Sequence, residues 1–298
     1  MLFIARFVTN KNLLFIFIFG IFIACNSGNL PEEKEDLQIS AEEVETEEAE
    51  TEETTDEREF SYLLPSTLQI AAIFKKSGLK YISDITNDHR SVSKYTTNFS
   101  KLLNLGVYSA DLCYVTLNKQ AQQKIHYLKT INNLADDLGF SSILASKSLL
   151  IRFEQNEENE DSMYTLLSEF QENLDIYLED NEQEENAVII FSGGWVESVY
   201  LGVVACKDDV NERLNMRIKE QLSILNNLIK NLEFYKNKND EIEGLINDLS
   251  SLKEMVENLA FMQDAGKEEG ISKTSISDEE LSKLASKIVE IRTKIIAG

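Results

Sequence analysis

Residues 214–232 read LNMRIKEQLSILNNLIKNL, and the spacing of their apolar side chains decides the fold class. Apolar side chains recur every third or fourth residue, at Leu214, Ile218, Leu222, Leu225, Ile229 and Leu232. That spacing keeps them on one face of an α-helix, because the helix completes a turn in about 3.6 residues. Most of the other positions are polar, so the stretch predicts an amphipathic helix with one buried stripe.

Two later stretches repeat this pattern. The apolar stripe of the first comprises Ile242, Leu245, Leu249, Leu252, Val256 and Leu259, and that of the second Leu281, Leu284, Ile288, Ile291 and Ile295. Ser277 and Glu280 have the spacing of a capping box at the start of the last helix, and Gly266 and Gly270 lie in the loop before it. Helices with a single apolar stripe are typical of antiparallel bundles.

Shorter helix signals of the same kind precede residue 214. We expect helices over residues 68–76, 92–117, 119–138, 141–153, 162–178 and 187–206, separated by polar segments such as 155–161 and 179–185. Pro65 suits a first helical turn, and Gly78 and Gly139 suit helix ends. The chain therefore predicts an all-α fold of about nine helices over residues 60–298, enough for two stacked bundles or one bundle with additions.

The composition excludes several functional classes. The chain has 29 Lys+Arg against 52 Asp+Glu, and this net charge of −23 argues against a nucleic-acid-binding protein. Its two histidines, His89 and His126, are too few for a multi-histidine metal centre, and neither follows a Glu by three residues as a di-iron site would require. We expect His89 to be a solvated loop residue and His126 to line a helix face, and we expect no metal and no cofactor.

The first 24 residues have the pattern of an export signal. Arg6 and Lys11 precede the uncharged apolar run LLFIFIFGIFIA at residues 13–24. A membrane-spanning helix needs about 20 apolar residues, so this shorter run is typical of a signal peptide.

Residues 22–25 (FIAC) resemble the lipobox of bacterial lipoproteins, and the Asn and Ser that follow are similar to the start of Bacteroidota-type lipoproteins. Ala24 and Cys25 match the lipobox pattern, whereas Phe22 and Ile23 are bulkier. The resemblance covers about the first 30 residues. It implies cleavage before Cys25, attachment of diacylglycerol to its sulfur, modification of the lipoprotein with palmitate, and anchoring in the outer-membrane lipid bilayer. An ordinary signal peptide and an uncleaved anchor are the alternatives.

Residues 25–59 are predicted to form a tether. Residues 26–59 contain fifteen acidic and two basic side chains, a net charge of −13. Such a stretch buries too little apolar surface to offset its ordering entropy, so we expect a disordered spacer between membrane and domain. The acid-rich segment 32–36 (EEKED) resembles export signals that send some Bacteroidota lipoproteins to the cell surface, and the choice between a periplasmic and a surface-exposed protein stays open.

Two acidic residues lie inside the most apolar predicted helices. Asp111 and Glu197 each precede a tyrosine by three residues, at Tyr114 and Tyr200, so that each tyrosine shares a helix face with its acid and has a hydroxyl to donate. If the acids face inward, the four side chains form a polar pocket for a cationic or hydroxylated ligand. We favour the commoner arrangement, in which such acids lie on the solvent side of half-buried helices. The similarity of the two segments leaves duplication and chance both open.

The glycines beside Trp195 are the least helix-favouring feature of their segment. Gly193 and Gly194 indicate close helix packing or a kink, and the alternative is a ligand that approaches the backbone with Trp195 as a stacking wall. Cys113 and Cys206 both lie in apolar runs, where a free thiol in the core is commoner than a disulfide.

These observations lead to two functional hypotheses. The first is a membrane-anchored cell-envelope lipoprotein whose helical domain binds an envelope protein or supports an assembly. The second is a small-ligand-binding or hydrolytic domain that uses Asp111, Tyr114, Trp195, Glu197 and Tyr200, although no catalytic motif is recognisable. A deep pocket where these residues converge would favour the second hypothesis, and an exposed apolar patch would favour the first.

Overall fold

The computed structural model describes residues 66–140, 151–153, 155–156, 159–208, 212–237, 239–263 and 276–298. Within these ranges the chain is helical and contains no strand, which confirms the predicted all-α fold. The signal peptide, Cys25, the tether, Pro65, residues 141–150 of one expected helix and the glycines at 266 and 270 lie outside the described residues.

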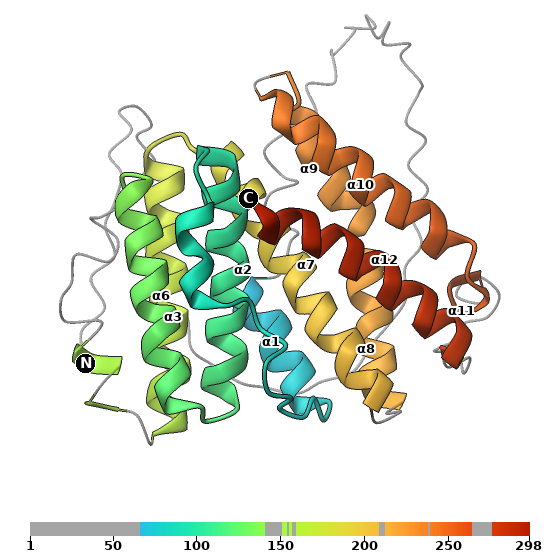
Figure 1. Cartoon of the computed structure of the whole chain (residues 1–298), viewed down its shortest axis with the longest axis horizontal. Helices are drawn as coiled ribbons and strands as arrows, with labels where there is room; N and C mark the ends of the chain where they lie inside the picture. Colours follow the sequence, from blue (N-terminus) through green and yellow to red (C-terminus); the bar gives the residue numbers. More distant parts are fainter. Residues whose placement is uncertain are drawn as a thin grey trace, which may run out of the picture. The chain divides into compact units, whose positions relative to one another are not determined.

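Ten α-helices and one 3₁₀ helix, η2, follow one another in the described part of the chain (Figure 1). Their bounds are α1 Thr67–Lys76, η2 His89–Lys94, α2 Asn98–Leu117, α3 Ala121–Asp137, α6 Glu160–Asp180, α7 Glu184–Asp208, α8 Glu212–Ser223, α9 Leu225–Tyr235, α10 Asp240–Glu257, α11 Ala260–Gln263 and α12 Asp278–Ala297.

Several helix ends lie where the sequence predicts them. The capping box at the start of α12 is present, with Glu280 N donating to Ser277 Oγ at 3.3 Å and Ser277 N donating to Glu280 Oε2 at 3.0 Å. Gly78 and Gly139 follow α1 and α3 with φ of 101° and 82°, a left-handed conformation that glycine adopts without strain.

Other predicted boundaries are wrong, because local side-chain hydrogen bonds interrupt the helices. The expected helix 92–117 begins only at Asn98, where Thr97 Oγ1 accepts from Ser100 N at 3.0 Å. Before it, Asp88 Oδ1 accepts from Arg90 N at 2.9 Å and starts the separate helix η2. The stretch 214–232 divides at Ile224 into α8 and α9, and α6 already begins within the segment 155–161 that was expected to be a loop.

Helices α2 and α7 form the most extensive helix pair of the described chain. In Figure 1, α7 runs between α2 and the C-terminal helix α12, and both of these pack against it. Helices α1 and α3 pack on α2, while α8, α9 and α10 extend the core on the other side of α7 and α12. The pair α2 and α7 is therefore the centre around which the other helices are arranged.

Glycines allow the backbones of α2 and α7 to touch. A Cβ atom on Gly106 would overlap the carbonyl oxygen of Ile190, and a Cβ on Gly193 would overlap that of Leu103. The close-packing interpretation of Gly193 and Gly194 is thus confirmed. Residues 103, 106 and 111 of α2 meet residues 193, 194 and 197 of α7 in the same order, so the two helices run in the same direction.

Helix α7 also has the length and composition of a membrane-spanning helix. The stretch Glu184–Cys206 has a mean hydropathy of 1.7, but 78% of its apolar window is buried inside the fold. A core helix of a globular protein has the same properties, so this finding is weak evidence for a membrane span.

The backbone contact between α2 and α7 predicts opposite effects for two glycine substitutions. Gly106→Ala should lower the free energy of unfolding by about 2–3 kcal/mol, because the backbone of Ile190 must move to admit the methyl group. Gly244→Ala, at a helical site with nothing within 4 Å of the new Cβ, should raise it by up to about 1 kcal/mol. Urea unfolding followed by circular dichroism measures both, and equal effects would contradict the proposed contact.

Candidate functional site

Asp111 and Glu197 lie together in the interior, between α2 and α7. Both side chains are 0% exposed, so the favoured prediction of surface acids is wrong. The glycine contact explains why they meet, because it brings the two helix backbones together about one turn before the acids.

Arg292 of α12 neutralises this buried pair. Its Nε donates to Glu197 Oε2 at 2.6 Å and its Nη2 to Glu197 Oε1 at 2.8 Å, a bidentate ion pair. Nη2 also donates to the carbonyl oxygen of Ile85 at 3.1 Å, and the guanidinium lies 4.1 Å from the ring centroid of Tyr200. The guanidinium of Arg292 therefore lies where a cationic ligand would bind if the acids formed a pocket.

The surroundings of Asp111 favour its protonated form. The backbone N–H of Asn87 donates to its Oδ2 at 3.0 Å, whereas Oδ1 is buried and receives no donor within the described residues. Burial raises the pKa of Asp111 well above its usual value, the charge of Glu197 raises it further, and Arg292 opposes both effects. A neutral Asp111 can donate to Glu197, with which it shares a side-chain hydrogen bond, and the three side chains then carry no net charge.

The two tyrosines do not serve the acids as expected. The hydroxyl of Tyr114 accepts from Ile82 N at 2.7 Å and donates to Lys80 O at 3.2 Å, and burial raises its pKa to about 12. These hydrogen bonds connect residues 80–82, which precede η2, to α2. Tyr200 contributes its ring to Arg292. The structure thus brings Asp111, Glu197 and Tyr200 together and directs the Tyr114 hydroxyl elsewhere.

Trp195 is fully buried in the core, and its Nε1 has no hydrogen-bond partner among the described residues. It lines neither of the two hollows described below, so the described structure does not place it as a stacking wall.

Further tyrosines hold the segment before α2 over this centre. Tyr127 and Tyr108 donate to the carbonyl oxygens of Asn87 and Asp88 at 2.8 and 2.9 Å, and Asn87 Nδ2 donates to the Tyr95 hydroxyl at 2.9 Å. The buried Asn87 therefore links Asp111 to the tyrosines, and the cluster is closed on this side by protein atoms.

Arg292 and Asn87 are the residues that the sequence did not single out. Arg292 stands one position after Ile291, at the edge of the apolar stripe of α12, where a basic side chain reaches the interior. That position is the one available signal. Asn87 contacts Asp111 through its backbone N–H, an interaction for which the sequence carries no signal.

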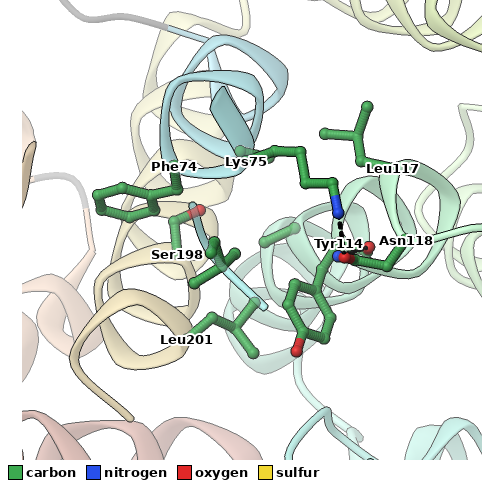
Figure 2. A pocket seen from close by; sticks show the side chains of 10 residues that line it. Phe74, Lys75, Tyr114, Leu117, Asn118, Ser198 and Leu201 are labelled. Atoms are coloured by element: carbon green, nitrogen blue, oxygen red, sulfur yellow. Dashed lines mark hydrogen bonds between the residues drawn. The ribbon is translucent and has the colours of Figure 1, made fainter. Parts of the chain in front are cut away.

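A hollow beside Tyr114 is too small for a ligand. It has a volume of about 10 Å³, roughly the space for one water molecule. In Figure 2, Lys75 from α1 reaches across towards Asn118, whose Oδ1 accepts from Lys75 Nζ at 2.6 Å, and Ser198 lies on the opposite wall. The Oγ of Ser198 is buried without a partner among the described residues, so one ordered water is the occupant that fits.

A larger hollow lies open on the surface between α1 and α6. This α1–α6 groove, formed by Ser66, Leu68 and Gln69 and by the outward face of residues 164–179, has a volume of about 410 Å³. Tyr164 and Ile176 in it are 41% and 48% exposed.

The rings of His89 and His126 lie against each other. His89 is the first residue of η2 and half-buried, not a fully solvated loop residue, and its ring stacks on His126 with centroids 4.4 Å apart. Burial lowers the pKa of His89, and His126 lowers it further. Within the described ranges, no three His, Cys, Asp or Glu side chains are grouped to hold a metal ion.

Cys113 and Cys206 are buried and are not joined by a disulfide, as the commoner arrangement predicts. Burial raises the pKa of Cys113 to about 12, which keeps it a protonated thiol. Cys206 Sγ lies 3.1 Å from Asn215 Oδ1.

Comparison of the chain with protein-family models, with curated proteins and with solved structures gave no match. Its class is therefore defined by its own geometry, as an all-α protein with a charge-balanced polar centre enclosed by its helices.

The buried ion pair predicts unequal costs for two substitutions on α12. Arg292→Leu should lower the free energy of unfolding by about 3–5 kcal/mol, because it leaves Glu197 charged and unpaired in the interior. Lys294 lies two residues after Arg292 and forms an exposed ion pair with Asp248. Lys294→Leu breaks that pair and should lower the free energy of unfolding by less than about 1 kcal/mol. Adding Glu197→Gln to Arg292→Leu should recover part of the loss. Similar urea midpoints for both single variants would contradict the role of Arg292.

The proton on Asp111 predicts a dependence of stability on pH. A raised folded-state pKa means that the folded chain holds a proton that the unfolded chain releases above about pH 4, so this contribution to stability falls as pH rises. Asp111→Asn, which mimics the protonated acid, should therefore gain stability relative to the unsubstituted chain between pH 4.5 and 7, by up to about 1.4 kcal/mol per pH unit. Urea unfolding across this range measures the difference, and a constant difference would show that Asp111 is ionised in the folded chain.

Proposed function

We propose that this chain is a membrane-tethered protein of the bacterial cell envelope whose helical domain binds a partner protein. The observation that carries the proposal is the contrast between the buried acidic cluster and the α1–α6 groove. In the buried cluster, Arg292 of the same chain forms an ion pair with Glu197. The α1–α6 groove, in contrast, is open and exposes apolar side chains.

A small-molecule site normally offers an enclosed cavity of about 300–1,000 Å³ lined by a few convergent polar groups. The small hollow beside Tyr114 has about 10 Å³ and is not lined by Asp111 or Glu197, and Arg292 already binds Glu197. The ligand-binding or hydrolytic alternative therefore has less support from the geometry than the binding of a partner.

The exposed apolar side chains support a binding surface on α6. Large exposed apolar side chains among the described residues are Ile151, Tyr164, Ile176, Met216, Phe234 and Val289. Single exposed apolar residues are common on any protein surface. Tyr164 and Ile176 differ from the others because both line one groove.

The membrane tether in this proposal rests on the N-terminal sequence. The resemblance of residues 22–25 to a lipobox supports acylation of Cys25 and attachment to the outer membrane, on either its periplasmic or its surface side. The acidic residues 26–59 then act as a spacer, since like charges extend the chain and are repelled by anionic lipid headgroups.

Labelling and cross-linking in cells test both parts of the proposal. The full chain should incorporate a clickable palmitate analogue and sediment with membranes, and Cys25→Ser should abolish the label and release the chain. A photo-cross-linking residue placed in turn at positions 164, 234 and 289, which are exposed and lie on α6, α9 and α12, should give a discrete protein adduct from at least one position. A chain that takes up no lipid, or gives no adduct at any position, would contradict the corresponding part.

A further inference from the structure

We infer that the α1–α6 groove binds a basic amphipathic helix of the partner protein. This inference rests on the proposed function and names the chemistry of the partner. Three features of the groove carry it: its length, its apolar side chains and the sign of its charges.

The groove follows α6 over a distance that suits a helix. From residue 164 to residue 179 the rise along α6 is about 22 Å, which matches about four turns of a bound helix. The buried Leu68 closes the groove on the α1 side, and Tyr164 and Ile176 offer exposed apolar area along its length. An amphipathic helix that lays its apolar face into such a groove is a common mode of peptide recognition.

The charges of the groove specify a basic occupant. Among the described residues, Glu172, Asp175 and Glu179 line it, and no Lys or Arg does. Their spacing of three and four residues places the carboxylates along one side of α6, opposite Lys or Arg residues at the same spacing on a bound helix. Asp175 is exposed, but desolvation by neighbouring atoms raises its pKa, and Gln171 Nε2, which donates to its Oδ1 at 3.0 Å, opposes this effect. A cation brought by the partner would stabilise its charged form.

Other occupants fit the groove less well. The chain's own residues 26–59 carry a net charge of −13 and are repelled by three carboxylates. A second copy of the domain would bring an identical acidic groove. A metal ion is disfavoured because these carboxylates are not grouped as ligands within the described residues.

Peptide binding to two matched variants tests the inference. The full chain with Cys25→Ser, which carries no lipid, is titrated with a fluorescent Leu/Lys amphipathic helix about four turns long and with its Leu/Glu counterpart. The Leu/Lys peptide should bind, more weakly at high salt, and the Leu/Glu peptide should not. Glu172→Gln, Asp175→Asn and Glu179→Gln together should weaken binding about tenfold. Glu233→Gln, Glu243→Gln and Glu254→Gln, at exposed positions on α9 and α10, change the net charge equally and should weaken it less than about twofold.

The apolar contribution is measured separately. Tyr164→Ala with Ile176→Ala should reduce binding at high salt, whereas Phe234→Ala, at an exposed position on α9, should not. Circular dichroism checks that every variant is folded. The inference is overturned if the two charge variants weaken binding equally, if the peptide does not bind, or if the Leu/Glu peptide binds as well.

Cross-linking in cells separates this inference from the proposed function. Adducts from position 164 whose partner segment is rich in Lys or Arg support the groove. Adducts only from positions 234 or 289, or adducts from position 164 to an acidic segment or to this same chain, overturn the groove inference. Adducts to another protein from positions 234 or 289 leave the proposed function standing. The absence of adducts at all three positions overturns the proposed function itself.

Discussion

The contact between the backbones of α2 and α7 is the constraint on which the rest of the described structure depends. Gly106 and Gly193 remove the side chains that would separate the helices, and the same approach places Asp111 beside Glu197. Two ionised carboxylates cannot share a dry interior. Arg292 of α12 balances the charge of Glu197, and burial raises the pKa of Asp111, which favours its neutral form, so the C-terminal helix completes the centre of the protein.

This charge balance has a consequence for where binding can occur. The guanidinium of Arg292 donates hydrogen bonds to Glu197 and to the carbonyl oxygen of Ile85, and it lies over the ring of Tyr200. The segment before α2 covers the cluster from another side. A ligand would have to replace several charge-assisted hydrogen bonds to enter, each stronger than a neutral one. The polar centre therefore acts as a structural connection between α2, α7 and α12, and the partner site that we propose lies instead on the surface of α6.

The sequence predicted the helices well because helical periodicity is a local property. The stripes of α8, α9, α10 and α12 and the capping box at Ser277 all depend on residues within a few positions of one another. The break before α2 was missed because Asp88 and Thr97 bond to the backbone in ways that composition does not reveal. Of the candidate site, the sequence located both acids. Their burial and their pairing with Arg292, 95 positions after Glu197, depend on packing between distant segments.

The acidic face of α6 is best explained by something other than folding. Acidic side chains three and four positions apart destabilise a helix by about 0.2–0.5 kcal/mol per pair, and the side chains at 172, 175 and 179 form two such pairs. The inner face of α6, with Leu166, Phe170 and Leu174, already provides its packing. Glu169 on the same helix is bound by Arg152 at 2.7 Å. Repulsion between these carboxylates lowers the stability of the helix and is not needed for folding. Such repulsion is expected on a surface that serves binding, because a basic partner would replace it with attraction on association.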